Sequence, residues 1–171
     1  MRTTTIAVVS LAALMFAAAP AGTQPHDDKE RAELAKAMKD AKISLAQGVK
    51  AGARAGTPIS GKYEIEDGKL QLSVYTVRRE KFSEVIVDHK TGKVAKTEPI
   101  TKDDDLKDAR AQRQVMAKAK RSLAAAATEA MKANAGFRAV AVVPAVKDDH
   151  PMAEVTLLKG AEWKTVTEKL D

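Results

Sequence analysis

The feature that most constrains the fold of this chain is an internal repeat. The segment Ala41-Lys42-Ile43-Ser44-Leu45-Ala46 returns as Ala119-Lys120-Arg121-Ser122-Leu123-Ala124. A shift of 78 positions places residues 38–47 on residues 116–125, and six of these ten positions are identical. Each copy lies in an Ala-rich stretch with helical character and precedes strand-like sequence, which is typical of a repeated supersecondary unit.

The strands that follow the two copies repeat in the same order. Residues 72–77 correspond to residues 153–158, and residues 81–85 to residues 162–166, at offsets near 81. The sequence therefore predicts an α+β protein of two tandem helix-on-antiparallel-sheet repeats (α-β-β-β). We expect two lobes with two small cores.

The N-terminus has the pattern of a secretory signal. Arg2 supplies the charged start, residues 6–18 form the apolar run, and Ala19-Pro20-Ala21 is a small-residue cleavage site. An uncleaved anchor is the alternative, but the run is short against the roughly 20 residues that span a bilayer. We expect cleavage before Gly22, no integral membrane span afterwards, and a periplasmic or secreted protein of bacterial type. The chain has no Cys, so no disulfide and no thiolate metal site is expected.

The chain is predicted to divide into five segments. These are a signal peptide (1–21), a leader with the start of the first helix (22–40), repeat 1 (41–97), a linker (98–105) and repeat 2 (106–171), which has a long first helix. In repeat 1, Ser44 and Gln47 form an S-x-x-Q pattern while Ile43 leaves the apolar stripe, so either the helix restarts at Ser44 or Ile43 is merely exposed. In repeat 2, one apolar face predicts a continuous helix from Leu106 to Ala130, capped by Thr101 or by one of residues 103–105.

Alternating residues and turn signals place the strands. Residues 62–66 and 70–74 flank Asp67-Gly68, which predicts a two-residue hairpin. Residues 82–87 form a third strand that ends at Asp88-His89-Lys90-Thr91-Gly92, where Asp88 can bond the turn backbone and Gly92 can take a positive φ. Residues 93–95 are a brief returning strand. In repeat 2 we expect strands at 137–143, stopped by Pro144, and at 154–158 and 162–167.

The first repeat resembles a known family. Its helix, its three strands and the closing phrase Val85-Ile86-Val87-Asp88-His89-Lys90-Thr91-Gly92-Lys93-Val94 resemble the PepSY domain, which closes with a V-D-x-x-T-G-x-V pattern. The match runs from about Asp40 to Val94, and residues 118–171 match in pattern without the closing phrase. The resemblance implies a stand-alone extracytoplasmic member that restrains or regulates a peptidase, and it supplies no catalytic residues.

No catalytic or metal-binding constellation stands out. The sequence contains no H-E-x-x-H and no G-x-S-x-G, so we expect no enzyme and no cofactor. His26, His89 and His150 each lie beside an Asp, but they fall in the leader or in turns and lack i,i+4 spacing, which favours solvated turn residues over a metal site. The sequence assigns no catalytic, cofactor-binding or metal-ligating residue, and it leaves the binding residues undefined.

The strand aromatics are Tyr63, Tyr75, Phe82 and Trp163. The favoured interpretation is that they cover the helices in the cores, and the alternative is that an outward-facing pair or an exposed sheet edge holds an extended peptide by strand addition. The aromatics are spread over separate strands, so they form no stacking platform and we expect no nucleic-acid partner.

Charge and composition leave three functional hypotheses. The full chain has a net charge of +6, loss of Arg2 with the signal lowers it by one, and both signs are interspersed. The leading hypothesis is non-catalytic binding to a protein partner, through which the chain modulates an extracytoplasmic peptidase or another envelope protein. The alternative is a structural or stress-related envelope protein that associates electrostatically with acidic surfaces, and the third is weak metal handling. The oligomeric state stays open.

Overall fold

The computed structural model describes residues 25–171, with side chains from Asp28 onward. The predicted signal, residues 22–24 of the leader and the His26 side chain therefore lie outside the described residues. The helical elements are α1 (Pro25–Ala37), the 3-10 turn η1 (Met38–Asp40), α2 (Leu45–Gly52), α3 (Asp103–Met116) and α4 (Leu123–Ala133). The strands are β1 (Thr57–Glu66), β2 (Lys69–Arg78), β3 (Lys81–Val87), β4 (Val94–Pro99), β5 (Arg138–Lys147), β6 (His150–Lys159) and β7 (Glu162–Lys169).

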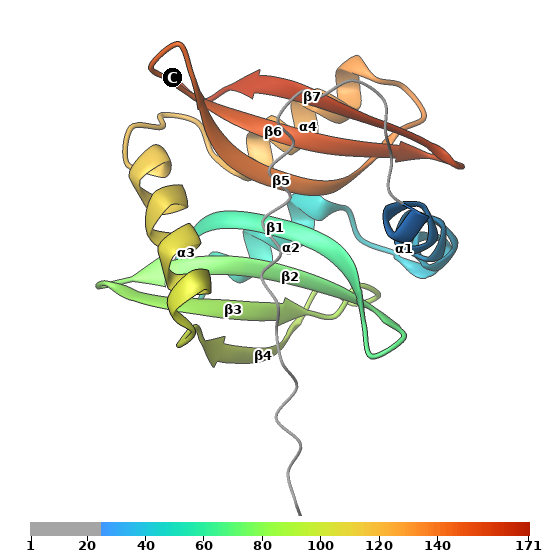
Figure 1. Cartoon of the computed structure of the whole chain (residues 1–171), viewed down its shortest axis with the longest axis horizontal. Helices are drawn as coiled ribbons and strands as arrows, with labels where there is room; N and C mark the ends of the chain where they lie inside the picture. Colours follow the sequence, from blue (N-terminus) through green and yellow to red (C-terminus); the bar gives the residue numbers. More distant parts are fainter. Residues whose placement is uncertain (1–24) are drawn as a thin grey trace, which may run out of the picture.

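All seven strands form one antiparallel sheet in the order β4-β3-β2-β1-β5-β6-β7, which confirms the α+β class (Figure 1). The two halves of the chain meet in the middle, where Gly61 and Lys62 of β1 pair with Val142 and Ala141 of β5. The expectation of two lobes with two separate cores is therefore wrong, because backbone pairing makes the sheet continuous across the halves.

The main core lies between the sheet and the helices α2 and α4, and both halves contribute to it. Leu45, Val49 and Leu72 come from the first half, and Leu123 and Leu157 from the second, all of them buried. The helices α2 and α4 pack against each other behind the sheet in Figure 1. Burial of one shared apolar layer couples the halves more strongly than a linker would.

A second, smaller core lies on the opposite face of the sheet. It contains Ile59, Tyr75, Phe82 and Ala109, and it is covered by α3, which crosses that face at one end (Figure 1). The two cores therefore lie on opposite faces of one sheet. They do not belong to separate halves of the chain.

The first helical stretch breaks where the sequence offered a restart. Gln47 N donates to Ser44 Oγ at 3.2 Å, and Ser44 N donates to Gln47 Oε1 at 2.7 Å. This reciprocal capping box satisfies two backbone N–H groups that the start of a helix otherwise leaves without partners. The restart at Ser44 is confirmed.

The second helical stretch differs from the prediction of one continuous helix. It splits into α3 and α4, which lie on opposite faces of the sheet. Ser122 caps α4, because its Oγ accepts from Ala125 N at 3.2 Å, and the backbone N–H groups of Lys120 and Arg121 donate to Leu170 O. These two N–H groups leave the helical pattern to bond a residue near the C-terminus, a contact that helical periodicity cannot predict. The N-cap of α3 is Lys102 rather than Thr101 or one of residues 103–105, and these three Asp residues form the first turn of the helix.

Several strands are longer than predicted. The hairpin at Asp67-Gly68 is confirmed, with φ values of 49° and 72°. β5 continues through Pro144 to Lys147, whereas we expected Pro144 to stop it. β1 pairs with β5 only at Val142 and Ala141, so β5 has no neighbour on that side at Pro144 and the missing N–H is tolerated. Among the described residues no helix is long and apolar enough to cross a membrane.

Candidate functional site

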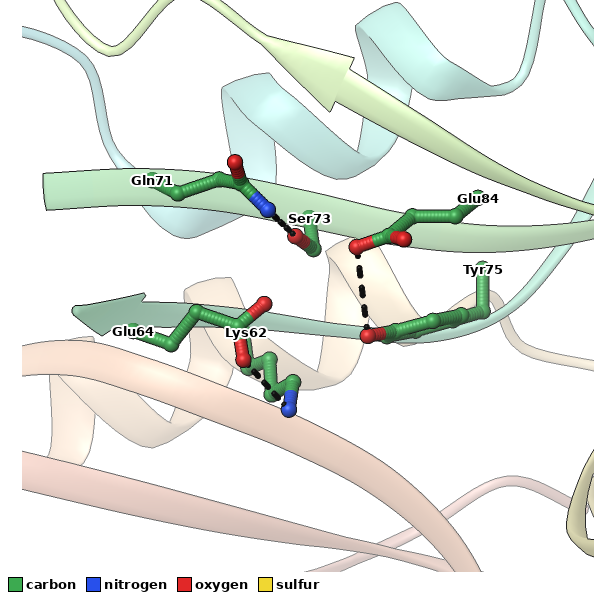
Figure 2. A network of polar contacts seen from close by, with 6 residues as sticks. All are labelled: Lys62, Glu64, Gln71, Ser73, Tyr75 and Glu84. Carbon is green, nitrogen blue, oxygen red and sulfur yellow. Dashed lines mark hydrogen bonds and ion pairs between the residues drawn. The ribbon is translucent and has the colours of Figure 1, made fainter. Parts of the chain in front are cut away.

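The most unusual feature of the structure is a group of polar side chains on the face of the sheet that carries α3. We call it the polar cluster, and it consists of Lys62 and Glu64 of β1, Gln71, Ser73 and Tyr75 of β2, and Glu84 of β3 (Figure 2). The strand pairs Lys62↔Ser73, Glu64↔Gln71 and Tyr75↔Glu84 place these residues side by side on one face, because directly paired residues in a sheet project to the same side.

Lys62 and Glu64 form the charged part of the cluster. They lie two residues apart on β1, so both side chains project to the same face. Lys62 Nζ lies 2.6 Å from Glu64 Oε2, and each of the two side chains is only 19% exposed to solvent. The same ammonium lies 5.9 Å from the centroid of the Tyr75 ring, where the negative face of the ring attracts a cation.

The second oxygen of Glu64 has no partner. Glu64 Oε1 is buried and lacks a hydrogen bond within the described chain. A buried carboxylate oxygen without a donor costs free energy, since water no longer solvates it. The atom is thus an acceptor with unused capacity on the surface of a sheet.

Glu84 is the most buried acid of the cluster, with 3% exposure. Tyr75 Oη donates to Glu84 Oε1 at 3.3 Å. Burial raises the pKa of the Glu84 carboxyl above its usual value, a hydrogen bond with Ser73 opposes the shift, and the charge of Glu64 adds to it. Burial also raises the pKa of Tyr75, which keeps its hydroxyl group protonated and able to donate.

Helices border the cluster at both ends of the sheet face. On α3, Gln112 Oε1 accepts from Ser60 Oγ at 2.8 Å, and Arg113 pairs with Glu80 in the β2–β3 turn. At the other end lies α1, whose Arg31 guanidinium lies 5.7 Å from the Trp163 ring centroid. Between α3 and α1 no described helix covers the sheet (Figure 1). We call this stretch the open face, and it consists of Lys62, Glu64, Ala141, Glu154, Thr156 and Thr165.

Two of the three histidines that the sequence singled out, His89 and His150, have described side chains. His150 is exposed, and its Nδ1 lies 2.6 Å from Asp171 Oδ2. His89 is half-buried in its turn, with Nδ1 buried and without a partner among the described residues, and its carbonyl accepts from Lys42 N and Ile43 N. The His26 side chain is not among those described. Within the described part of the chain, no three His, Cys, Asp or Glu side chains come together as metal ligands.

The strand aromatics have three different environments. Tyr63 belongs to the main core and donates from its hydroxyl to Ile43 O at 2.9 Å. Tyr75 and Phe82 are buried on the opposite face beneath α3, not against the main-core helices as predicted. Trp163 is only half-buried, although it aligns with Phe82 in the sequence. Trp163 packs against the main core and Phe82 lies in the second core, so both contribute to a core, but to different ones and with unequal burial.

The turn at residues 88–92 has the expected geometry. Asp88 Oδ1 accepts from Lys90 N and Thr91 N, both at 2.8 Å, and Gly92 has a φ of 74°. These two hydrogen bonds hold the pKa of the exposed Asp88 carboxyl below its usual value, with Thr91 contributing most. The turn therefore has a structural role, and its polar atoms point to their own backbone.

The polar cluster brings together charged groups and hydrogen-bonding groups. It combines one ammonium group, two carboxyl groups, a phenol, a hydroxyl and an amide, with no His or Cys among them. The Glu64 carboxyl group has a buried oxygen without a partner, and burial raises the pKa of the Glu84 carboxyl group, which favours its neutral form. Comparison of the chain with protein-family models, with curated proteins and with solved structures finds no match.

The sequence contained one signal for this site that our prediction did not use. In 70–75, Leu70, Leu72 and Val74 alternate with Gln71, Ser73 and Tyr75. Alternation of this kind assigns Gln71, Ser73 and Tyr75 to the face opposite the main core and its helices, α2 and α4. The prediction assigned Tyr75 to the helix side on account of its aromatic character, but its position in the alternation places it with the polar set.

Proposed function

We propose that this protein is an exported, non-catalytic binding module of PepSY type, which holds a protein partner on its open face and thereby modulates an extracytoplasmic peptidase or another envelope protein. The observation that carries the proposal is the asymmetry of the sheet. One face is sealed by α2 and α4, whereas the open face presents polar side chains that are partly or fully exposed, among them Glu154 and Thr165, beside the incompletely partnered carboxylate of Glu64. Such groups gain free energy when a partner supplies the missing donors.

We also propose that the fold arose from two tandem copies of one unit. The backbone contacts support this origin. Lys42 N and Ile43 N donate to His89 O, and Lys120 N and Arg121 N donate to Leu170 O, so the segment before each capping Ser is tied to the end of its own half. The strands that open each half, β1 and β5, are both irregular in register, β1 between Pro58 and Ser60 and β5 between Ala139 and Ala141.

Export and the regulatory role rest on sequence features. Residues 1–21 have the pattern of a cleaved signal, and the phrase at residues 85–94 resembles the close of a PepSY domain. In the structure this phrase forms the end of strand β3, the Asp88 turn and the first residue of β4, which is a packing and turn element. A regulator that acts by binding needs no catalytic group, which agrees with the chemistry of the polar cluster.

Affinity capture with a blocked variant tests the proposal. The purified chain of residues 22–171 is incubated with an envelope extract of its source organism and washed at high salt. Thr165 is exposed on the open face, so Thr165→Tyr places a ring over it. Lys132 on α4 belongs to the opposite layer and its side chain is 68% exposed, so Lys132→Tyr is the matched control. We expect one identified protein to be retained by wild type and Lys132→Tyr and to be lost with Thr165→Tyr.

An activity assay then separates regulation from simple adhesion. If the retained protein is a peptidase, wild type should change its rate of substrate hydrolysis and Thr165→Tyr should not. If every captured protein elutes with salt and Thr165→Tyr behaves as wild type, the proposal is wrong and electrostatic association with acidic surfaces explains the binding better, because salt screens exposed charges.

A further inference from the structure

We infer that the open face recognises a basic segment of the partner, with Lys or Arg side chains placed on Glu64 and Glu154. The inference rests on the proposed binding function and names the chemistry of the partner. Both carboxylates belong to the same face of the sheet, and each lacks part or all of the partners that a buried or half-buried carboxylate needs.

Glu64 supplies the stronger of the two positions. Its Oε2 is engaged by Lys62, while Oε1 is buried and without a donor in the described chain. A carboxylate can accept from two donors at once, and a guanidinium or ammonium group is the donor that compensates its remaining charge best. The Glu64 side chain is 19% exposed, so a basic side chain reaches it by turning the carboxylate until Oε1, which is buried in the free chain, accepts from the new donor.

Glu154 supplies the second position. Lys62 pairs with Ala141 and Ala141 pairs with Thr156, so Glu154, two residues from Thr156 on β6, projects to the same face as Lys62. Glu154 is half-buried and has no hydrogen-bond or ion-pair partner within residues 25–171. Unlike Glu64, its carboxyl group makes no ion pair with a cation of the described chain.

The distance between the two carboxylates indicates the form of the partner. β1 and β6 are separated by β5, which places them about 10 Å apart, and the register offsets Glu64 from Glu154 by four residues, or about 13 Å along the strands. Their backbones are therefore about 16 Å apart, too far for a single cation to bridge. An extended segment covers this distance in about five residues.

Charge favours a basic occupant over an acidic one. The chain as a whole has a net charge of +6, so an acidic partner would be attracted to most of its surface. The open face carries two carboxyl groups, Glu64 and Glu154, against one ammonium group, Lys62, which makes it locally acidic. A basic segment is thus directed to this face and repelled elsewhere, which gives specificity as well as attraction.

Peptide titration of the purified chain, followed by amide chemical shifts, tests the inference. The probe is an eight-residue peptide with blocked ends, Lys at positions 2 and 6 and Thr elsewhere, because side chains four residues apart in an extended chain project to the same side. The matched peptide has Glu at those two positions. We expect the Lys peptide to shift resonances of β1, β5 and β6, and the Glu peptide to leave them unchanged. Glu64→Gln and Glu154→Gln should each weaken binding about tenfold, since each removes a charge-assisted bond.

Glu129→Gln is the control, because it removes the same charge from α4 in the opposite layer and should bind as wild type. Equal binding of the two peptides, or unchanged affinity in both Gln variants, would overturn the inference. Sedimentation of wild type as a dimer whose interface covers β1, β5 and β6 would overturn it too, because the occupant would then be a second copy. If Thr165→Tyr abolishes capture of the partner while both Gln variants retain it, the proposed function stands and only the basic chemistry fails.

Discussion

Replacement of Arg138 by Met should destabilise the fold by about 3 kcal/mol. The Arg138 guanidinium donates to Met38 O at 2.7 Å, to Ala41 O at 3.2 Å and to Ile43 O at 3.4 Å, so a residue of β5 ties down the segment before α2 from about a hundred positions away. A hydrogen bond to a charged group contributes about 1.5–3 kcal/mol, and the longer ones contribute less. Ile43 O keeps a donor in the variant because Tyr63 also bonds it, so the loss falls mainly on Met38 and Ala41.

Urea unfolding followed by both circular dichroism and Trp163 fluorescence measures this loss. Met retains most of the aliphatic volume, so the change isolates the hydrogen bonds. We expect one transition by both probes, an unchanged m-value, and a melting temperature lower by about 10 °C. Arg110→Met, which removes an exposed guanidinium from α3, should change the stability by less than about 0.5 kcal/mol.

A loss below about 1 kcal/mol for Arg138→Met would refute the assigned role of these hydrogen bonds. Two separate unfolding transitions in wild type would contradict the description of the fold itself. They would mean that the halves unfold independently, contrary to the shared core and the continuous sheet.

Three further predictions concern stability. Gly48→Ala should destabilise by about 1 kcal/mol although Ala is the better helix former, because its Cβ would lie 2.3 Å from Leu72 Cδ2 in the main core. Glu84→Gln should stabilise the protein at pH 7. The native carboxyl has a raised pKa, so wild-type stability falls as pH rises from 4.5 through the raised native value, and the variant should lack this fall. Ser44→Ala and Ser122→Ala should each cost about 1 kcal/mol, with the larger loss at Ser44, whose cap is reciprocal.

These predictions have their own controls. Lys50 on α2 is exposed, so Lys50→Ala should leave the unfolding free energy almost unchanged. If Gly48→Ala proves more stable than wild type, the side chain of Leu72 can move to make room for the new Cβ, and the expected loss is wrong. Glu162→Gln, at the exposed start of β7, should keep the wild-type pH profile. If Glu84→Gln also keeps that profile, another group causes the pH dependence.

Local chemistry allowed much of the fold to be predicted. The Asp67-Gly68 hairpin, the restart at Ser44 and the Asp88 turn depend on residues within four positions of one another, and all three are observed. The split between α3 and α4 depends instead on Leu170 O, which lies about fifty residues away and draws two N–H groups out of the helix. The alignment of Ser122 with Ser44 was the available clue, since a repeat that restarts once is expected to restart twice.

The candidate site was less predictable than the fold. Alternation in β1 and β2 groups Lys62, Glu64 and Ser73 on one face, but it does not determine what covers that face. The open face exists because α3 crosses only one end of the sheet and α1 lies at the other, and both placements depend on long-range contacts such as Ser60 with Gln112. The raised pKa of Glu84 likewise depends on burial, which arises only once the sheet has assembled.

Site-specific photocrosslinking tests the central claim most directly. A benzophenone amino acid is placed at Thr165 on the open face, and in a matched variant at Lys132 on α4 in the opposite layer. After irradiation in the envelope extract, the account predicts one discrete adduct with a protein partner from position 165, none from position 132, and competition by the Lys peptide. Adducts from position 132 alone, or an identical spread from both positions, would contradict the claim that the open face is the binding surface.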